Sequence, residues 1–169
     1  NMLRLFPLTG RWWRKCWADA NEIFCFRNRE DGTDMKCVEV YEKIYGQEPA
    51  SVAFCPYRVS PLGAHIDHQH GIVNGLAINK GIHIAYHPKQ NGVVELKSLD
   101  FPKRAQFFVN AVPEIRENDW ADHLRGAAKM LGEKYRLKIG LSGVIEGSLP
   151  IGGLSSSAAV IISFLTVLC

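Results

Sequence analysis

Residues 150–159 read Pro150-Ile151-Gly152-Gly153-Leu154-Ser155-Ser156-Ser157-Ala158-Ala159 and stand directly before an apolar run that ends at Cys169. The run predicts a buried helix, and the glycines and serines predict its N-terminus. The first N–H groups of a helix lack partners inside it, and their dipoles give that end a partial positive charge that attracts anions. The stretch therefore predicts either a phosphate-binding turn or an ordinary serine-capped helix after a glycine turn.

The spacing within this stretch differs from two common phosphate-binding motifs. No lysine follows Gly153, as a Walker loop requires, and the G-x-G-x-x-G spacing of dinucleotide-binding folds is absent. Gly152 and Gly153 still allow the main chain to approach a ligand closely, and the serine hydroxyls are able to cap the helix, bind phosphate or ligate a cation. A different kind of phosphate loop is expected.

A second polar segment, residues 55–71, lies well upstream of the first and places one arginine, one aspartate and three histidines between prolines and glycines. Such a composition is unsuited to a core. His65, Asp67, His68 and His70 are able to ligate a transition metal, which makes a metal-dependent hydrolase an alternative. Their order differs from the H-x-H-x-D-H order of metallohydrolases, and the sequence has no second ligand cluster downstream.

Taken in order, the segments 55–71 and 149–159 resemble the first two motifs of the GHMP small-molecule kinases, in particular galactokinase and its sugar-acid relatives. The stretch Trp120-Ala121-Asp122-His123-Leu124-Arg125-Gly126 is similar to the helix that precedes the family's glycine loop. The resemblance implies that residues 35–169 are the N-terminal part of such a kinase domain, truncated before its third motif, and that residues 1–34 are an N-terminal extension. It also implies an α+β fold with a two-layer mixed sheet and helices on one face.

The function that the resemblance implies is an ATP-dependent sugar 1-kinase. Such an enzyme transfers the γ-phosphate of ATP, with Mg²⁺, to the anomeric hydroxyl of galacturonate or galactose. Its catalytic base is expected beyond Cys169, in the missing C-terminal half. The alternative is a catalytically inactive fragment or sensor that binds sugar or nucleotide without turnover.

The resemblance also assigns roles to individual residues. Arg58 lies near the acceptor hydroxyl and supports the aspartate base, and Ser156 ligates Mg²⁺. The sugar-binding residues are His65, Asp67 and His68. The residues that wrap the ATP phosphates are Pro150, Gly152, Gly153, Leu154, Ser155, Ser156, Ser157 and Ala158. For each serine, simple helix capping is the alternative.

Ala64 occupies a position at which galactokinases carry a glutamate that contacts the far end of the sugar. Loss of that negative side chain lowers repulsion toward a carboxylate on C6, which favours a hexuronic acid as acceptor. The string from Gly63 to Gln69 is similar to that of plant-type galacturonate kinases. The loop 150–154 is one residue shorter than the galactokinase pattern, so the phosphate cradle is expected to be tighter.

The charge distribution argues against a nucleic-acid partner. The chain of 169 residues has a net charge of +3, but the first 18 residues hold four basic residues and no acid, which leaves 3 − 4 = −1 for the rest. Five scattered cysteines without a C-x-x-C pair fit reduced thiols in the cytoplasm rather than a disulfide framework. The apolar run before Cys169 is too short to cross a membrane, so no membrane partner is expected.

The local patterns predict the order of the elements. Helices are expected over residues 38–45, 120–135 and 158–169, and strands over 52–54 and 139–145. The helix over 120–135 presents one apolar stripe, formed by Leu124, Ala127, Ala128, Leu131 and Tyr135. Asn91-Gly92 between the β-rich runs 81–87 and 93–99 predicts a β-hairpin.

Overall fold

The sheet at the centre of the molecule has five strands in the order β1-β2-β5-β3-β4. The computed structural model describes residues 35–63, 69–149 and 156–169. The strands are Ser51–Val59 (β1), Leu76–Lys89 (β2), Val93–Ser98 (β3), Arg104–Phe108 (β4) and Gly140–Gly147 (β5). The pair β3 and β5 is parallel, and the other neighbours are antiparallel. The predicted mixed sheet is therefore confirmed.

The predicted hairpin at Asn91-Gly92 is wrong in its pairing, although the turn itself is present. Gly92 adopts a φ of 70°, as a tight turn favours. However, β5 lies between the two strands that this turn connects, with Ile84 opposite Ile145 on one side and Val94 opposite Leu141 on the other. A local turn signal does not report whether its two strands pair with each other, because a strand from far along the chain can enter between them.

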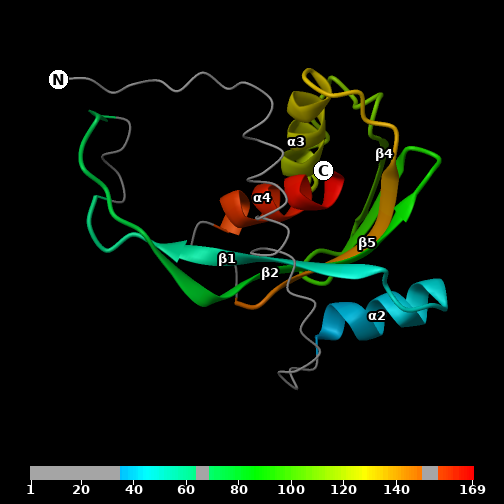
Figure 1. Ribbon diagram of the computed structural model, residues 1–169, viewed down its shortest axis with the longest axis horizontal. Helices are drawn as coiled ribbons and strands as arrows, with labels where there is room; N and C mark the ends of the chain where they lie inside the picture. The colour runs from blue at the N-terminus through cyan, green and yellow to red at the C-terminus, as the bar shows by residue number, and fades with distance from the viewer. Residues whose placement is uncertain (1–34, 64–68, 150–155) are drawn as a thin grey trace, which may run out of the picture.

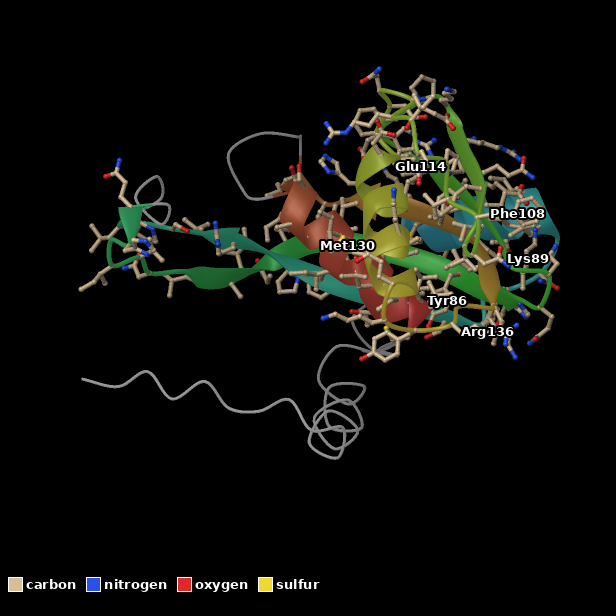
Figure 2. All side chains as sticks on the ribbon, turned by 90° about the horizontal axis from the view of Figure 1, so that it is seen from above. Tyr86, Lys89, Phe108, Glu114, Met130 and Arg136 are labelled. Atoms are coloured by element: carbon tan, nitrogen blue, oxygen red, sulfur yellow. The ribbon has the colours of Figure 1, made fainter. Side chains whose placement is uncertain are left out.

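Two helices cover one face of the sheet, as Figure 1 shows. They are α3 (Asp122–Gly132) and α4 (Ser156–Leu168). Alternate residues of the strands, such as Ile84 and Leu96, are fully buried beneath them together with Leu124 of α3 and Phe164 of α4. In Figure 2 the two helices lie side by side across the sheet. The expected two-layer arrangement is confirmed for this face.

A third helix, α2 (Lys36–Tyr45), packs on the opposite face, so the helices are not confined to one side. Cys37 and Tyr41 are one turn apart and fully buried against Ala85 and Val144, the strand residues that point away from α3 and α4. The Cys37 backbone N–H donates to Glu146 Oε2 at 2.9 Å. This contact ties the start of α2 to the end of β5.

The predicted helix over 120–135 is shorter than its apolar pattern. It ends at Gly132, and Tyr135 is 56% exposed, so Tyr135 does not belong to the buried stripe. The helix predicted over 38–45 and the strand predicted over 139–145 are confirmed with boundaries that differ by one or two residues. The apolar run before Cys169 forms α4, as expected.

The strands β1 and β2 extend beyond the helices as a two-stranded arm, clearly visible in both figures. Beyond the paired strands, where the connecting loop begins, the Leu62 N–H donates to Asn74 Oδ1 at 2.9 Å, and the Asn74 N–H donates to the Leu62 carbonyl at 3.2 Å. Gly63, at φ 79°, lies against the Ile72 carbonyl with no room for a Cβ. Within the described residues, none of the helices is long and apolar enough to span a bilayer.

Candidate nucleotide site at the start of α4

A cavity of about 220 Å³ opens beside the first residues of α4. Ser156, the first residue of this helix, and Ser157 form one side of it. The ends of strands β1, β3 and β5 contribute Tyr57, Ser98 and Gly147, and the chain before α3 contributes Phe101 and Trp120. The helix end, which favours anions, therefore borders a largely apolar cavity.

The floor of the cavity is fixed by Asp100. Its Oδ2 accepts a hydrogen bond from the Gly147 N–H at 3.1 Å, and its own N–H donates to Ser98 Oγ at 3.1 Å. A Cβ on Gly147 would lie 2.9 Å from the Tyr57 hydroxyl and 3.3 Å from Asp100 Oδ2. A Cβ at the end of β5 would therefore displace the Tyr57 hydroxyl and crowd the Asp100 carboxylate, which favours glycine at this position.

Burial raises the pKa of the Tyr57 hydroxyl, and the nearby Asp100 carboxylate raises it further. The Tyr57 ring is 2% exposed. Tyr57 therefore remains a neutral phenol at physiological pH and forms a rigid wall of the cavity.

Another part of the cavity lining is aromatic. Phe101 and Trp120 stack with their rings nearly parallel, at an interplanar angle of 4° and a centroid distance of 6.2 Å. The Trp120 Nε1–H donates to the Lys103 carbonyl at 2.8 Å. Because its polar hydrogen is already bonded, the indole offers this cavity a planar apolar surface.

The structure places part of the predicted site at this cavity. Ser156 and Ser157 line it, and the exposed Ala158 follows them in the first turn of α4. Arg58 is exposed near the end of β1, directly after Tyr57, and its aliphatic stem packs on Gly75. The predicted position of Arg58 at a strand end is therefore confirmed, while its role stays a prediction.

The remaining predicted site residues lie outside the described residues. They are His65, Asp67, His68, Pro150, Gly152, Gly153, Leu154 and Ser155. The described parts of the chain hold no group of three or more His, Cys, Asp or Glu side chains that could bind a metal ion. The metal-hydrolase alternative rests on residues 65–70, most of which are not described, and it stays untested.

Sequence reasoning missed Tyr57, Asp100, Phe101 and His123 as lining residues of this cavity. Tyr57 was part of the segment 55–71 but had no assigned role. Asp100 and Phe101 lie two and three residues after the end of β3, and an acidic and an aromatic residue just past a strand end are a usable signal for a site. The sequence alone could not show that these residues join the cavity, because only the parallel pairing of β3 with β5 brings residue 100 beside residue 147.

Comparison with known proteins gives a consistent result. The galactokinase galactose-binding signature matches residues 39–88, which run from α2 through the arm to the end of β2. A galacturonokinase of Arabidopsis thaliana is 38% identical over 136 residues, covering 69% of this chain and 32% of that protein. A galactokinase of Clostridium perfringens is 35% identical over 120 residues, with coverage of 69% and 31%.

Solved structures agree with these relatives. The galactokinase of Lactococcus lactis, determined in complex with galactose, superposes with a TM-score of 0.67 at 28% identity and covers 75% of this chain and 34% of its own. The mevalonate kinase of Methanococcus jannaschii, at 22% identity and a TM-score of 0.52, shares the fold. The chain spans about a third of the length of the curated relatives that it matches.

Proposed function

Because the chain belongs to the galactokinase-like group of the GHMP kinases, we propose that it provides the nucleotide-binding and sugar-binding segments of an ATP-dependent sugar 1-kinase. The proposed acceptor is the anomeric hydroxyl of a hexuronic acid, galacturonate. The observation that carries the proposal is the cavity at the start of α4, where a helix N-terminus and an aromatic wall meet. These are the two surfaces that a nucleoside triphosphate needs.

The size and lining of the cavity suggest which part of ATP it would bind. Its volume of about 220 Å³ lies below the range of roughly 300–1,000 Å³ typical of sites for whole drug-sized ligands. We therefore assign it to the base of ATP, stacked against Trp120. The phosphates would lie at the N-terminus of α4, on the backbone and hydroxyls of residues 150–158, where the helix dipole offsets their charge.

The acceptor side of the site is assigned to the arm. Arg58 would neutralise charge on the transferring phosphoryl group, while His65, Asp67 and His68 would bind and orient the sugar. We place the general base outside residues 1–169. Arg58 supports this assignment as an exposed cationic residue near the end of β1, the strand that also carries the cavity-lining Tyr57.

Ser156 fits the role of a magnesium ligand, because a hydroxyl oxygen is a hard donor and this one lies at the helix end that also favours phosphate. When bound, Mg²⁺ would offset the negative charge on the phosphates. Mg²⁺ in proteins usually also takes one or two carboxylates, together with waters and phosphate oxygens. We place the further acidic ligand outside residues 1–169.

The experiment that tests this function measures ATP binding to the chain by calorimetry, with Mg²⁺ and with EDTA. Ser156→Ala should weaken binding about tenfold with Mg²⁺ and much less in EDTA, as loss of a metal ligand requires. Thr166→Val is the matched control on α4, since the Thr166 hydroxyl bonds to the Ile162 carbonyl of its own helix. Equal weakening in both conditions would indicate a helix cap and contradict the magnesium assignment. Failure of the unsubstituted chain to bind ATP would contradict the proposed function.

A further inference from the structure

We propose that Arg125 is a positioning residue for the base of ATP. It clamps the turn that carries Trp120, and so holds the aromatic wall of the cavity in place. The proposal rests on the proposed function, because it concerns the same site, and it assigns a role to a side chain that does not itself line the cavity.

Arg125 lies on the buried side of α3 and is 4% exposed. Its Nη1 and Nη2 donate to the two carboxylate oxygens of Asp119 at 2.8 and 3.1 Å, a bidentate pair. Nη1 also donates to Asp122 Oδ1 at 2.7 Å, and Nη2 lies 3.0 Å from Glu117 Oε2. One guanidinium thus gathers three carboxylates from the chain just before and at the start of α3.

These carboxylates in turn hold the backbone on both sides of Trp120. Asp119 Oδ1 accepts the Ala121 N–H at 3.0 Å. Asp122 accepts the N–H groups of Glu117 and Asn118 at 3.2 and 2.9 Å. Trp120 stands between Asp119 and Ala121, so both of its neighbours are fixed by groups that Arg125 binds.

The arrangement is better suited to fixing a position than to adding stability. Burying a charged pair carries a desolvation cost that offsets much of its Coulombic gain, so buried ion pairs are weak evidence for stability. The planar guanidinium, by contrast, fixes the direction of each hydrogen bond, which a lysine ammonium does not. The Arg125 hydrogen bonds hold the pKa of Asp119 below its ordinary value, so Asp119 stays ionised near neutral pH. We call Arg125 and the carboxylates that it binds the clamp.

The test compares ATP with inorganic triphosphate, which lacks a base, as ligands of the unsubstituted chain and of Arg125→Lys. The lysine variant retains the charge but loses the bidentate geometry. We expect its affinity for ATP to fall roughly tenfold, the order of one base–aromatic stacking contact, while its affinity for triphosphate stays unchanged. Lys129→Met is the matched control, because Lys129 lies one turn further along α3 and contacts Glu114 instead.

A second readout needs no ligand. In a chain with Trp12, Trp13 and Trp17 replaced by phenylalanine, acrylamide quenching reports on Trp120 alone. Quenching should rise at least twofold in Arg125→Lys and stay unchanged in Lys129→Met. If Arg125→Lys does not fold, Asp119→Asn takes its place, because it removes the negative charge that Arg125 binds with two hydrogen bonds.

Three outcomes would overturn the proposal. Unchanged ATP affinity in a folded clamp variant shows that the wall does not depend on Arg125. Equal losses for ATP and triphosphate indicate general destabilisation. If the unsubstituted chain binds triphosphate as tightly as ATP, the base site of the proposed function is wrong and the clamp has no ligand to serve, even where the quenching of Trp120 responds to Arg125→Lys.

Discussion

Ala64 is the residue that we expect to determine whether the sugar acceptor carries a carboxylate. It lies outside the described residues, but the neck of its loop is fixed by the hydrogen bonds between Leu62 and Asn74. A carboxylate placed about 4 Å from the carboxylate of a sugar acid costs roughly 1–4 kcal/mol at the dielectric constants of water and protein surfaces. We therefore expect the absence of that charge in this chain to favour a sugar acid as the acceptor.

Ala64→Glu should reduce binding of galacturonate about tenfold, because the two negative charges repel each other, and should leave galactose binding equal or stronger. The measurement is a titration of the chain with each sugar in the presence of ATP. Ala64→Gln is the control, since it adds the same bulk without the charge. If the glutamine variant discriminates as strongly as the glutamate variant, size rather than charge sets the preference.

Cys37 gives a residue-scale prediction about pH. Burial, with a smaller contribution from Glu146, raises the pKa of its thiol from the ordinary 9.0 to about 12. Between these values the unfolded chain loses this proton and the folded chain keeps it, so the free energy of unfolding falls as pH rises above 9. The slope from this one group is at most about 1.4 kcal/mol per pH unit, and the contribution is intact below pH 9.

Urea unfolding at pH 8, 9 and 10.5 tests this expectation. The stability advantage of the unsubstituted chain over Cys37→Ala should shrink between pH 9 and 10.5, because alanine does not titrate. Parallel pH profiles for the two proteins would show that Cys37 ionises in the folded state as readily as in the unfolded one.

At the scale of elements, the insertion of β5 between β2 and β3 depends on Gly140. A Cβ on this residue would overlap the backbone N, C and O atoms of Val93, so the two strands could not approach each other. Gly126 lies within α3, and apart from the backbone of its own helix and its chain neighbours, no atom lies within 4 Å of where a Cβ would stand. Alanine substitutions at these two glycines are therefore expected to change stability in opposite directions.

Gly140→Ala should lower the free energy of unfolding by about 2 kcal/mol or more, through backbone displacement at the centre of the sheet. Gly126→Ala should raise it by roughly 0.5–1 kcal/mol, because alanine loses less conformational entropy in a helix than glycine does. Chemical denaturation of both variants checks the pair. A destabilised Gly126→Ala, or a neutral Gly140→Ala, would contradict the packing described for that position.

The elements also show how far the sequence alone could lead. The apolar spacing of α2 and α3 and the apolar run of α4 identify these helices, because their burial depends on local periodicity. The pairing of β5 with both β2 and β3 could not be predicted from the turn at Asn91-Gly92, because it depends on residues distant in sequence. The serines of α4 could be predicted as site residues because they belong to a local sequence motif. Asp100 and Tyr57 could not, because strand pairing brings them to the cavity.

At the scale of the whole molecule, the arm of β1 and β2 exposes apolar side chains beyond the helices. Ile72 is 93% exposed and Leu76 is 61% exposed, and Leu62 and Val73 lie in the same part of the chain. Adjacent apolar side chains of this kind promote association in water. Self-association of the chain is the expected result.

Sedimentation velocity over a range of concentrations should show this association, and the double variant Ile72→Lys, Leu76→Lys should reduce it. Ile115→Lys is the control, because Ile115 is 83% exposed but lies outside the arm. A monomer at all concentrations, or an equal effect of the control, would show that the arm is not the contact.

The position of β5 also sets an order of events during synthesis. Until residues 140–147 leave the ribosome, β2 and β3 each present an inner edge of unpaired N–H and C=O groups, although a turn already joins them. The centre of the sheet is consequently the last part to be completed, which slows folding and leaves these edges free to pair with other chains. The nascent protein is thus most vulnerable to aggregation in the interval before β5 arrives.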